Sequence, residues 1–244
     1  AVMFYEEMYK TKILDFGLVP HPDFDIFGAS PDGICEDLNN GNDEYIARMV
    51  EIKCPPKRKF TKTVLPGYWM QMQGQMEVCD LDECDFFQVK LEEYESFEDY
   101  SNDRFEIDSV TQDGRTSLNY PKGVVATYKV ADKLVYDFCP LNKSNEELLT
   151  WMKFHRENDI DENKKAEHLL EMKLWRIERY ECTLVKRDHG WWNSMIGEIL
   201  RFSKDLEYFK KDNNIQILKE RIEKSKKRKK KEEPKPLENF LLVG

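Results

Sequence analysis

Residues 26–35 read IFGASPDGIC and residues 45–54 read YIARMVEIKC, and these two stretches decide the fold. Each stretch is expected to form a strand. The first run enters a tight turn at the Pro-Asp-Gly of 31–33, and Asn-Asn-Gly-Asn at 39–42 is a strong turn signal between the runs. Pro-Pro at 55–56 ends the second run. The pattern predicts a β-hairpin with an acidic residue in its first turn.

The flanking sequence predicts helices and further strands around this hairpin. A helix is expected over 1–16 with Gly17 as its stop, and another from Pro66 to about Cys79, since proline suits the first turn of a helix. The remaining segments predict a strand at 85–91, hairpins within 100–138, a helix at 144–155 capped by Ser144 and Glu147, a strand at 169–187, a helix at 190–211 and a frayed helix over 219–236.

These elements predict an α/β fold with a mixed central β-sheet flanked by helices. We expect one domain over 1–218, with a hairpin insertion at about 92–140. Residues 219–244 are predicted to form a charged, Lys-rich tail that is partly disordered.

Composition excludes several classes of protein. Apolar residues make up 40% of the 244 residues, enough for a core, and no run approaches the roughly 18 apolar residues of a membrane span. No signal peptide opens the sequence, and six scattered cysteines do not suggest a disulfide framework. An intracellular, reducing location without a membrane partner is expected.

Charge is unevenly distributed along the chain. Residues 219–244 carry ten basic and five acidic side chains, which leaves 28 basic and 42 acidic ones, a net charge of −14, on residues 1–218. A field of this sign repels phosphate, which argues against a general nucleic-acid binder. Two local features weaken that argument. Five basic residues lie within ten positions, namely Lys53, Lys57, Arg58, Lys59 and Lys62. A metal ion bound by a carboxylate cluster would also reverse the local negative field of that cluster.

The chemistry of the chain is predicted from Asp32 and the Glu51-Ile52-Lys53 tripeptide. Period two in a strand puts Glu51 and Lys53 on one face and Ile52 on the other, in the core. If the two runs pair, Asp32 and Glu51 converge, and their carboxylates, with the carbonyl of Ile52, offer oxygen ligands to Mg²⁺ or Mn²⁺. A lysine beside such a site suits metal-assisted phosphodiester hydrolysis. Taken alone, Glu-x-Lys is usually a surface ion pair and Pro-Asp-Gly a simple turn.

Three blocks of sequence together resemble a known family. FGASPDG at 27–33, VEIKCP at 50–55 and YWMQMQGQM at 68–76 resemble the YqaJ-like viral recombinase family, the lambda-exonuclease branch of the PD-(D/E)XK nucleases. The resemblance is best over residues 1–91 and implies a restriction-endonuclease-like core. It also implies that Asp32 and Glu51 bind metal, that Lys53 is the catalytic lysine, and that Gln71 helps to orient the site.

Further residues are candidates for contact with DNA. Gln75 lies one helical turn after Gln71, and Ser30 precedes the metal-binding turn. The loop after the second strand is basic, and its alternative interpretation is a solvated surface. The predicted DNA-binding set is Ser30, Lys57, Arg58, Lys59, Lys62 and Gln75. For Trp69, packing in the core is favoured over stacking on a base.

One departure from the family concerns the first helix. The family carries an acidic residue there, which by alignment falls a few residues before Ala1. Glu6 and Glu7 lie about two turns further along, and we interpret them as surface or capping charges.

The resemblance implies metal-dependent DNA cleavage from duplex ends, 5′-to-3′, in viral or phage recombination or repair. Its implied partners are double-stranded DNA, a single-strand annealing protein and further copies of the chain. Alternatives are an endonuclease, an RNA-degrading enzyme, or an inactive nucleic-acid-binding module of the same fold. The basic run from Lys224 to Lys231 fits a nuclear localisation signal, a DNA tether or a solubilising segment, so that a nuclear or viral replication site is one expected location.

Overall fold

The computed structural model describes residues 1–36, 43–57, 60, 63–157, 167–211 and 214–232. Contacts between residues divide the chain into two compact units, Ala1–Arg187 and Asp188–Gly244. The division therefore falls before residue 218, where the sequence placed the domain boundary. Within the described part of the chain, no helix has the length and apolar content needed to cross a membrane.

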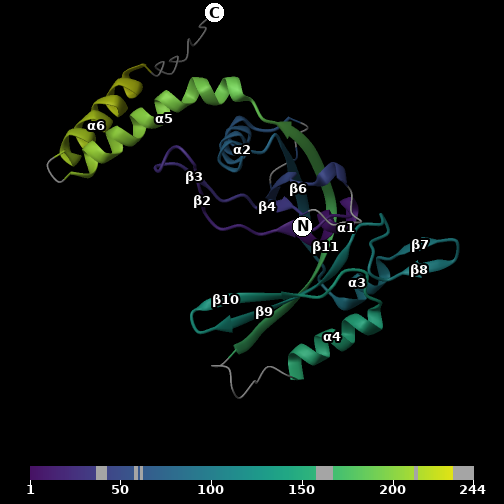
Figure 1. Cartoon of the computed structure of the whole chain (residues 1–244). Helices are drawn as coiled ribbons and strands as arrows, with labels where there is room; N and C mark the ends of the chain where they lie inside the picture. The colour runs from purple at the N-terminus through teal and green to yellow at the C-terminus, as the bar shows by residue number, and fades with distance from the viewer. Residues whose placement is uncertain (37–42, 58–59, 61–62, 158–166, 212–213, 233–244) are drawn as a thin grey trace, which may run out of the picture. The chain divides into compact units, whose positions relative to one another are not determined.

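A mixed seven-stranded sheet forms the centre of the first unit (Figure 1). Its β5 and β6 pair in parallel, and every other neighbouring pair is antiparallel. The predicted α/β class, a mixed sheet flanked by helices, is confirmed. In spatial order the strands are β1 Ile13–Leu14, β4 Gly33–Cys35, β5 Met49–Lys53, β6 Glu83–Glu93, β11 Glu167–Lys186, β9 Lys122–Val130 and β10 Lys133–Phe138.

The predicted hairpin forms by the pairing of β4 with β5. Gly33 lies opposite Val50 and Ile34 opposite Met49. Before this hairpin, the short strands β2 (Val19–Pro20) and β3 (Gly28–Ala29) make a separate ribbon, and the 3-10 turn η1 (Asp43–Tyr45) leads into β5. The expected strand over 26–35 is thus interrupted at 30–32, because the chain turns there to move from one sheet to the other.

Helix α2 (Pro66–Cys79) connects the two parallel strands β5 and β6. Parallel neighbours require such a crossover, and Pro66 begins the helix at the position predicted from the sequence. Its Met72 and Met76 are fully buried against Met49, Phe86 and Val185, with Trp69 packed beside them. These three side chains form an apolar stripe through which α2 covers one face of the sheet, and the predicted packing of Trp69 in the core is confirmed.

Helix α1 (Val2–Tyr9) covers the opposite face and is shorter than the sequence predicted. Its Phe4 and Tyr5 are buried against Val50 and Phe87. The helix stops at Lys10, which adopts a left-handed conformation with φ 55°, because the chain turns to pair residues 13–14 with β4. The expected continuation to residue 16 is therefore wrong.

The segment at 92–140 contains α3 (Phe97–Asn102) and two hairpins. The first hairpin, β7 (Phe105–Ile107) and β8 (Val110–Gln112), is separate from the main sheet. The second, β9 and β10, extends the main sheet beyond β11, so this part of the expected insertion belongs to the central architecture.

Helix α4 (Asn145–Glu157) begins with the predicted capping box. The backbone N–H of Glu147 donates to Ser144 Oγ at 3.2 Å, and the N–H of Ser144 donates to Glu147 Oε2 at 2.9 Å. Leu148 and Met152 of this helix are buried with Val124 of β9.

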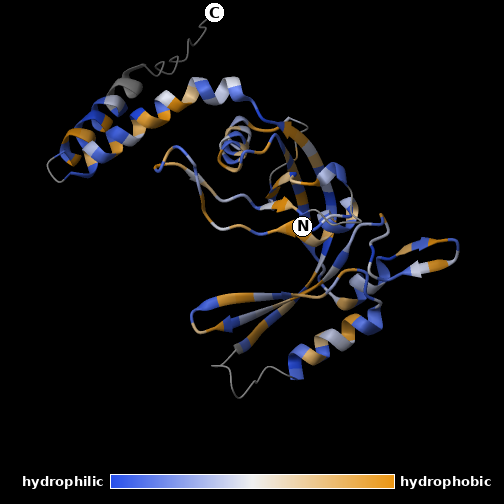
Figure 2. Ribbon diagram, in the orientation of Figure 1, coloured by the Kyte–Doolittle hydropathy of each residue, from blue (hydrophilic) through white to orange (hydrophobic). Residues whose placement is uncertain are grey.

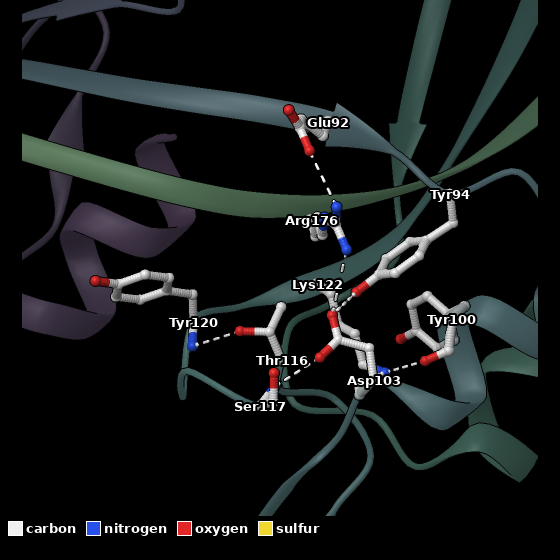
Figure 3. Close-up of polar contacts among 9 residues, drawn as sticks. All are labelled: Glu92, Tyr94, Tyr100, Asp103, Thr116, Ser117, Tyr120, Lys122 and Arg176. Atoms are coloured by element: carbon white, nitrogen blue, oxygen red, sulfur yellow. Dashed lines mark hydrogen bonds and ion pairs between the residues drawn. The ribbon is translucent and has the colours of Figure 1, made fainter. Parts of the chain in front are cut away.

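A buried polar network holds α3 and the loop before β9 against the sheet (Figure 3). Lys122, 1% exposed, donates to the backbone oxygens of Tyr100 and Asp103. Tyr94 Oη donates to Asp103 Oδ2 at 2.6 Å, and Arg176 joins Asp103 to Glu92. Burial lowers the pKa of Lys122 to about 8.

The second unit contains helices α5 (His189–Lys210) and α6 (Ile215–Glu232) in its described part. Asp188 caps α5 by accepting from the N–H of Trp191 at 2.9 Å, and apolar and polar residues alternate around the helix (Figure 2). The predicted helix at 190–211 is confirmed. The expected tail is helical to Glu232, and residues 233–244 lie outside the described part.

Candidate active site

Asp32 is tied directly to strand β5. Its exposed carboxylate accepts a hydrogen bond from the backbone N–H of Ile52, with 2.7 Å between Oδ2 and N. Ile52 is the middle residue of the predicted Glu-x-Lys segment, so this bond brings the turn before β4 to that segment. The two halves of the predicted motif, 19 residues apart in sequence, therefore meet in the fold.

Glu51 is the buried centre of the arrangement, with a side chain that is 0% exposed. Its Oε1 accepts from Lys53 Nζ and, at 2.8 Å, from Gln71 Nε2. Its Oε2 accepts from Gln75 Nε2 at 3.0 Å. A buried carboxylate is costly without such partners, and here the three donors compensate the charge and fix its orientation.

Lys53 lies on the same face of β5 as Glu51, as period two predicts. Its ammonium group is also 5.4 Å from the centre of the Tyr68 ring at the start of α2. The side chain remains 24% exposed, so it joins the buried glutamate to a surface that solvent or a substrate can reach. Ile52 packs on the opposite face with the α1 core, as expected.

Helix α2 delivers the two glutamines to this site. Gln71 and Gln75 are one turn apart and both donate to Glu51. Gln75 is only 5% exposed and also lies 3.3 Å from the carbonyl oxygen of Ser30. The Gln75 amide therefore donates to groups inside the protein, whereas the sequence predicted that it contacts DNA. Gln73, which points away from Glu51, instead donates to the carbonyl of Lys186 at 2.9 Å.

The oxygen donors present fit a hard divalent ion such as Mg²⁺ or Mn²⁺. Asp32 supplies a carboxylate that is hydrogen-bonded to the backbone N–H of Ile52, the residue after Glu51. Glu51 supplies a second carboxylate, and the carbonyl of Ile52 belongs to the same strand as Glu51. The described residues contain no group of three or more His, Cys, Asp or Glu side chains arranged to hold a metal. The two carboxylates would thus hold an ion together with water or substrate oxygens, which Mg²⁺ commonly retains.

The two acidic residues of α1 are occupied elsewhere. Glu6 Oε1 accepts from the N–H of Ile13 at 3.0 Å, and Glu7 pairs with Arg115 and accepts from Asn142 Nδ2 at 2.8 Å. Both are half-buried and hold neighbouring segments in place, whereas the sequence suggested surface or capping charges.

The structure describes only part of the predicted DNA-binding set. Ser30 and Lys57 are exposed, while Arg58, Lys59 and Lys62 lie outside the described residues. Phe60, between them in sequence, is 9% exposed and packs beneath the guanidinium of Arg179 in β11. Arg179 could not be singled out from the sequence, because its position depends on the pairing of β11 with β6, in which it lies opposite Lys90.

A comparison with known protein families finds a match in the segment of the chain that contains the candidate site. Residues 1–82 match the YqaJ-like viral recombinase domain. The predicted resemblance is therefore confirmed over the part of the chain that contains Asp32, Glu51, Lys53, Gln71 and Gln75.

One relative extends the sequence likeness over more of the chain. An uncharacterized protein of Acanthamoeba polyphaga mimivirus is 29% identical over 215 residues, covering 76% of this chain and 38% of the relative. This chain thus spans less than half the length of that relative. Among solved structures, an alkaline exonuclease from Laribacter hongkongensis, alone and in complex with dAMP, aligns at a TM-score of 0.40 with 19% identity, covering 90% of this chain and 67% of that one.

Proposed function

We propose that the chain is a metal-dependent deoxyribonuclease that hydrolyses phosphodiester bonds from the ends of duplex DNA. The observation that carries the proposal is the buried Glu51, which holds Lys53 and Gln71 beside the Asp32 turn. Two carboxylates, a lysine and an orienting amide are the groups that metal-assisted hydrolysis of a phosphodiester needs. The match of residues 1–82 to a viral recombinase domain supports DNA as the substrate.

In this proposal Asp32 and Glu51 hold Mg²⁺ or Mn²⁺ with the carbonyl of Ile52. Such an ion, when bound, polarises the phosphoryl group and lowers the pKa of a coordinated water. Lys53 orients the attacking water and stabilises negative charge that develops on the phosphate oxygens. Gln71 fixes the carboxylate of Glu51 in one orientation, so that these groups need no rearrangement during the reaction.

Gln75 has a different role in the proposal. Because its amide reaches both Glu51 and the carbonyl of Ser30, it holds the Asp32 turn and strand β5 at a fixed separation. It acts as a positioning residue behind the site. Contact with DNA phosphates is assigned to Ser30 and to the basic loop of Lys57, Arg58, Lys59 and Lys62.

The biological setting extends the proposal. A 5′-to-3′ exonuclease in viral or phage recombination or repair leaves single strands. A protein that anneals such single strands is therefore one proposed partner. Further copies of the chain are another, because an oligomer would favour processive cleavage. The basic end of the second unit supports action at a nuclear or viral replication site, as an address or a DNA tether.

The proposal is tested by incubating end-labelled linear duplex, covalently closed circular DNA and RNA with the chain in Mg²⁺ or Mn²⁺. We expect loss of the linear duplex alone, abolished by EDTA and by Lys53→Ala. Lys153→Ala is the matched control, because this lysine is 72% exposed on α4. Helix α4 contacts β9 and β11, and β9 lies three places from β5 in the sheet order.

The alternatives give different results in the same assay. Nicking of circles would indicate an endonuclease, and preferential loss of RNA would indicate a ribonuclease. Binding of DNA without any cleavage would indicate an inactive binding module and would contradict the proposal.

A further inference from the structure

We propose that Arg179 binds a backbone phosphate of the substrate strand next to the candidate active site. This inference rests on the proposed function, since it takes a nucleic acid as the substrate, and it adds a binding position outside the predicted motif.

Strand register puts Arg179 on the same face of the sheet as the site. Lys53 of β5 pairs with Gln88 of β6, and Arg179 of β11 pairs with Lys90, two residues further along β6. Side chains of directly paired residues, and of residues two apart, point to the same face. Arg179 is thus two strands from Lys53, a lateral separation of about 10 Å, on the face that carries Glu51.

The guanidinium of Arg179 is held in place by an aromatic ring. Its Cζ lies 4.4 Å from the centre of the Phe60 ring, which is 9% exposed and belongs to the loop that follows β5. Stacking on a ring leaves the edge of a guanidinium available for hydrogen bonds to phosphate oxygens, and it reduces the entropy lost on binding.

Charge pairing distinguishes Arg179 from its basic neighbours. Arg176 pairs with Glu92 and Asp103, and Lys90 pairs with Glu92 and Glu178. Arg187, at the end of the same strand, pairs with Glu77 and Asp80.

Arg179 itself is exposed, and among the described residues it has no ion pair with any carboxylate. In a unit of negative net charge, an exposed and unpaired cation beside a phosphodiester site is suited to a phosphate.

The test measures binding of a short blunt duplex to the full chain in EDTA, so that no cleavage occurs, over a series of salt concentrations. We expect Arg179→Ala to weaken binding about tenfold and to lower the slope of log K against log salt by about 0.9, the value for one lost phosphate contact. Arg104→Ala is the control, because the substitution removes the same charge from a different place. Arg104 is 48% exposed and precedes β7, which belongs to the separate β7–β8 sheet. The control substitution should leave affinity and slope unchanged.

Two further variants keep the test decisive. Arg179→Lys should preserve the slope, since it keeps the charge, but lose part of the affinity with the stacking on Phe60. Arg179→Gln removes the charge but keeps a polar side chain with three carbons beyond Cα, and it should behave like Arg179→Ala, which covers the case of an alanine variant that does not fold. Unchanged slope in folded Arg179→Gln would overturn the inference.

Failure of this inference and failure of the proposed function give different results. If the wild-type chain cleaves duplex DNA and the slope does not depend on Arg179, only the phosphate contact is wrong. If the slope falls with Arg179→Gln but no DNA is cleaved, the contact stands and the nuclease proposal is wrong. In an active chain the variant should raise KM and leave kcat unchanged, because the contact contributes equally before and during the reaction.

Discussion

At the scale of single residues, the site depends on hydrogen bonds around one buried carboxylate. Glu51 receives three donors, from Lys53, Gln71 and Gln75, and only Lys53 belongs to its own strand. The sequence predicts the acidic pair and the lysine because their spacing is local. The double role of Gln75 is not predictable from sequence, since it depends on how deeply α2 lies against the Ser30 turn.

Gln75→Leu should lower kcat about tenfold to a hundredfold and leave KM nearly unchanged. The substitution leaves Glu51 Oε2 and the carbonyl of Ser30 without their shared donor, so the carboxylate loses its fixed orientation. Steady-state cleavage of a linear duplex measures both constants. A raised KM with an unchanged kcat would instead indicate that Gln75 contacts DNA.

The lowered pKa of buried Lys122 should make the free energy of unfolding depend on pH. Burial lowers its pKa to about 8 in the folded chain, against about 10.4 when unfolded, so from pH 8 upward the unfolded chain binds more protons than the folded one. This group therefore makes the free energy of unfolding rise between about pH 8 and 10.

Urea unfolding of wild type and Lys122→Met across that range measures the effect. The variant should be less stable throughout, because two backbone oxygens lose their donor, and the difference between the two proteins should grow with pH. A difference that is constant or shrinks above pH 8 would show that Lys122 is not held with a lowered pKa.

At the scale of elements, local signals predict those helices and strands whose ends are fixed by nearby residues. The bounds of α2 follow from Pro66 and its methionine stripe, and the start of α4 follows from the Ser144 capping box. Helix α1 is mispredicted because its end is set by a long-range pairing of residues 13–14 with β4, which local periodicity does not contain. The hairpin was predicted, but its two paired positions are fewer than its apolar runs suggest.

Gly33→Ala should destabilise the chain and reduce cleavage. An added Cβ would lie 2.1 Å from Ile13 Cγ2 and 3.2 Å from the carbonyl oxygen of Leu14, so β1 or β4 must move, and Asp32 is the adjacent residue. Overpacking of this kind costs roughly 1–3 kcal/mol. Gly67→Ala, in the first turn of α2, meets no atom within 4 Å and should be neutral or slightly stabilising. Thermal unfolding measured alongside cleavage checks this, and equal behaviour of the two variants would contradict it.

At the scale of the whole molecule, one parallel strand pair in an otherwise antiparallel sheet makes the site. The crossover through α2 puts β6 beside β5, and β11 then brings residues from the end of the first unit to the same face. Sequence predicted the α/β class, but not that β9 and β10 complete the sheet or that the chain divides after Arg187. The place of β9 and β10 in the sheet depends on the pairing of β9 with β11, from Val130 opposite Glu167 to Lys122 opposite Arg176, which local sequence patterns do not contain.

The most direct measurement is the binding of Mn²⁺ to the wild-type chain and to Asp32→Asn, by titration calorimetry, paired with cleavage of a linear duplex by the same samples. An asparagine at 32 can still accept from the N–H of Ile52, so the turn should stay in place while one metal-binding charge is lost. We expect Asp32→Asn to lose at least tenfold in Mn²⁺ affinity and nearly all cleavage. Retention of both Mn²⁺ binding and cleavage in Asp32→Asn would contradict the assignment of this carboxylate, with Glu51, as the metal site.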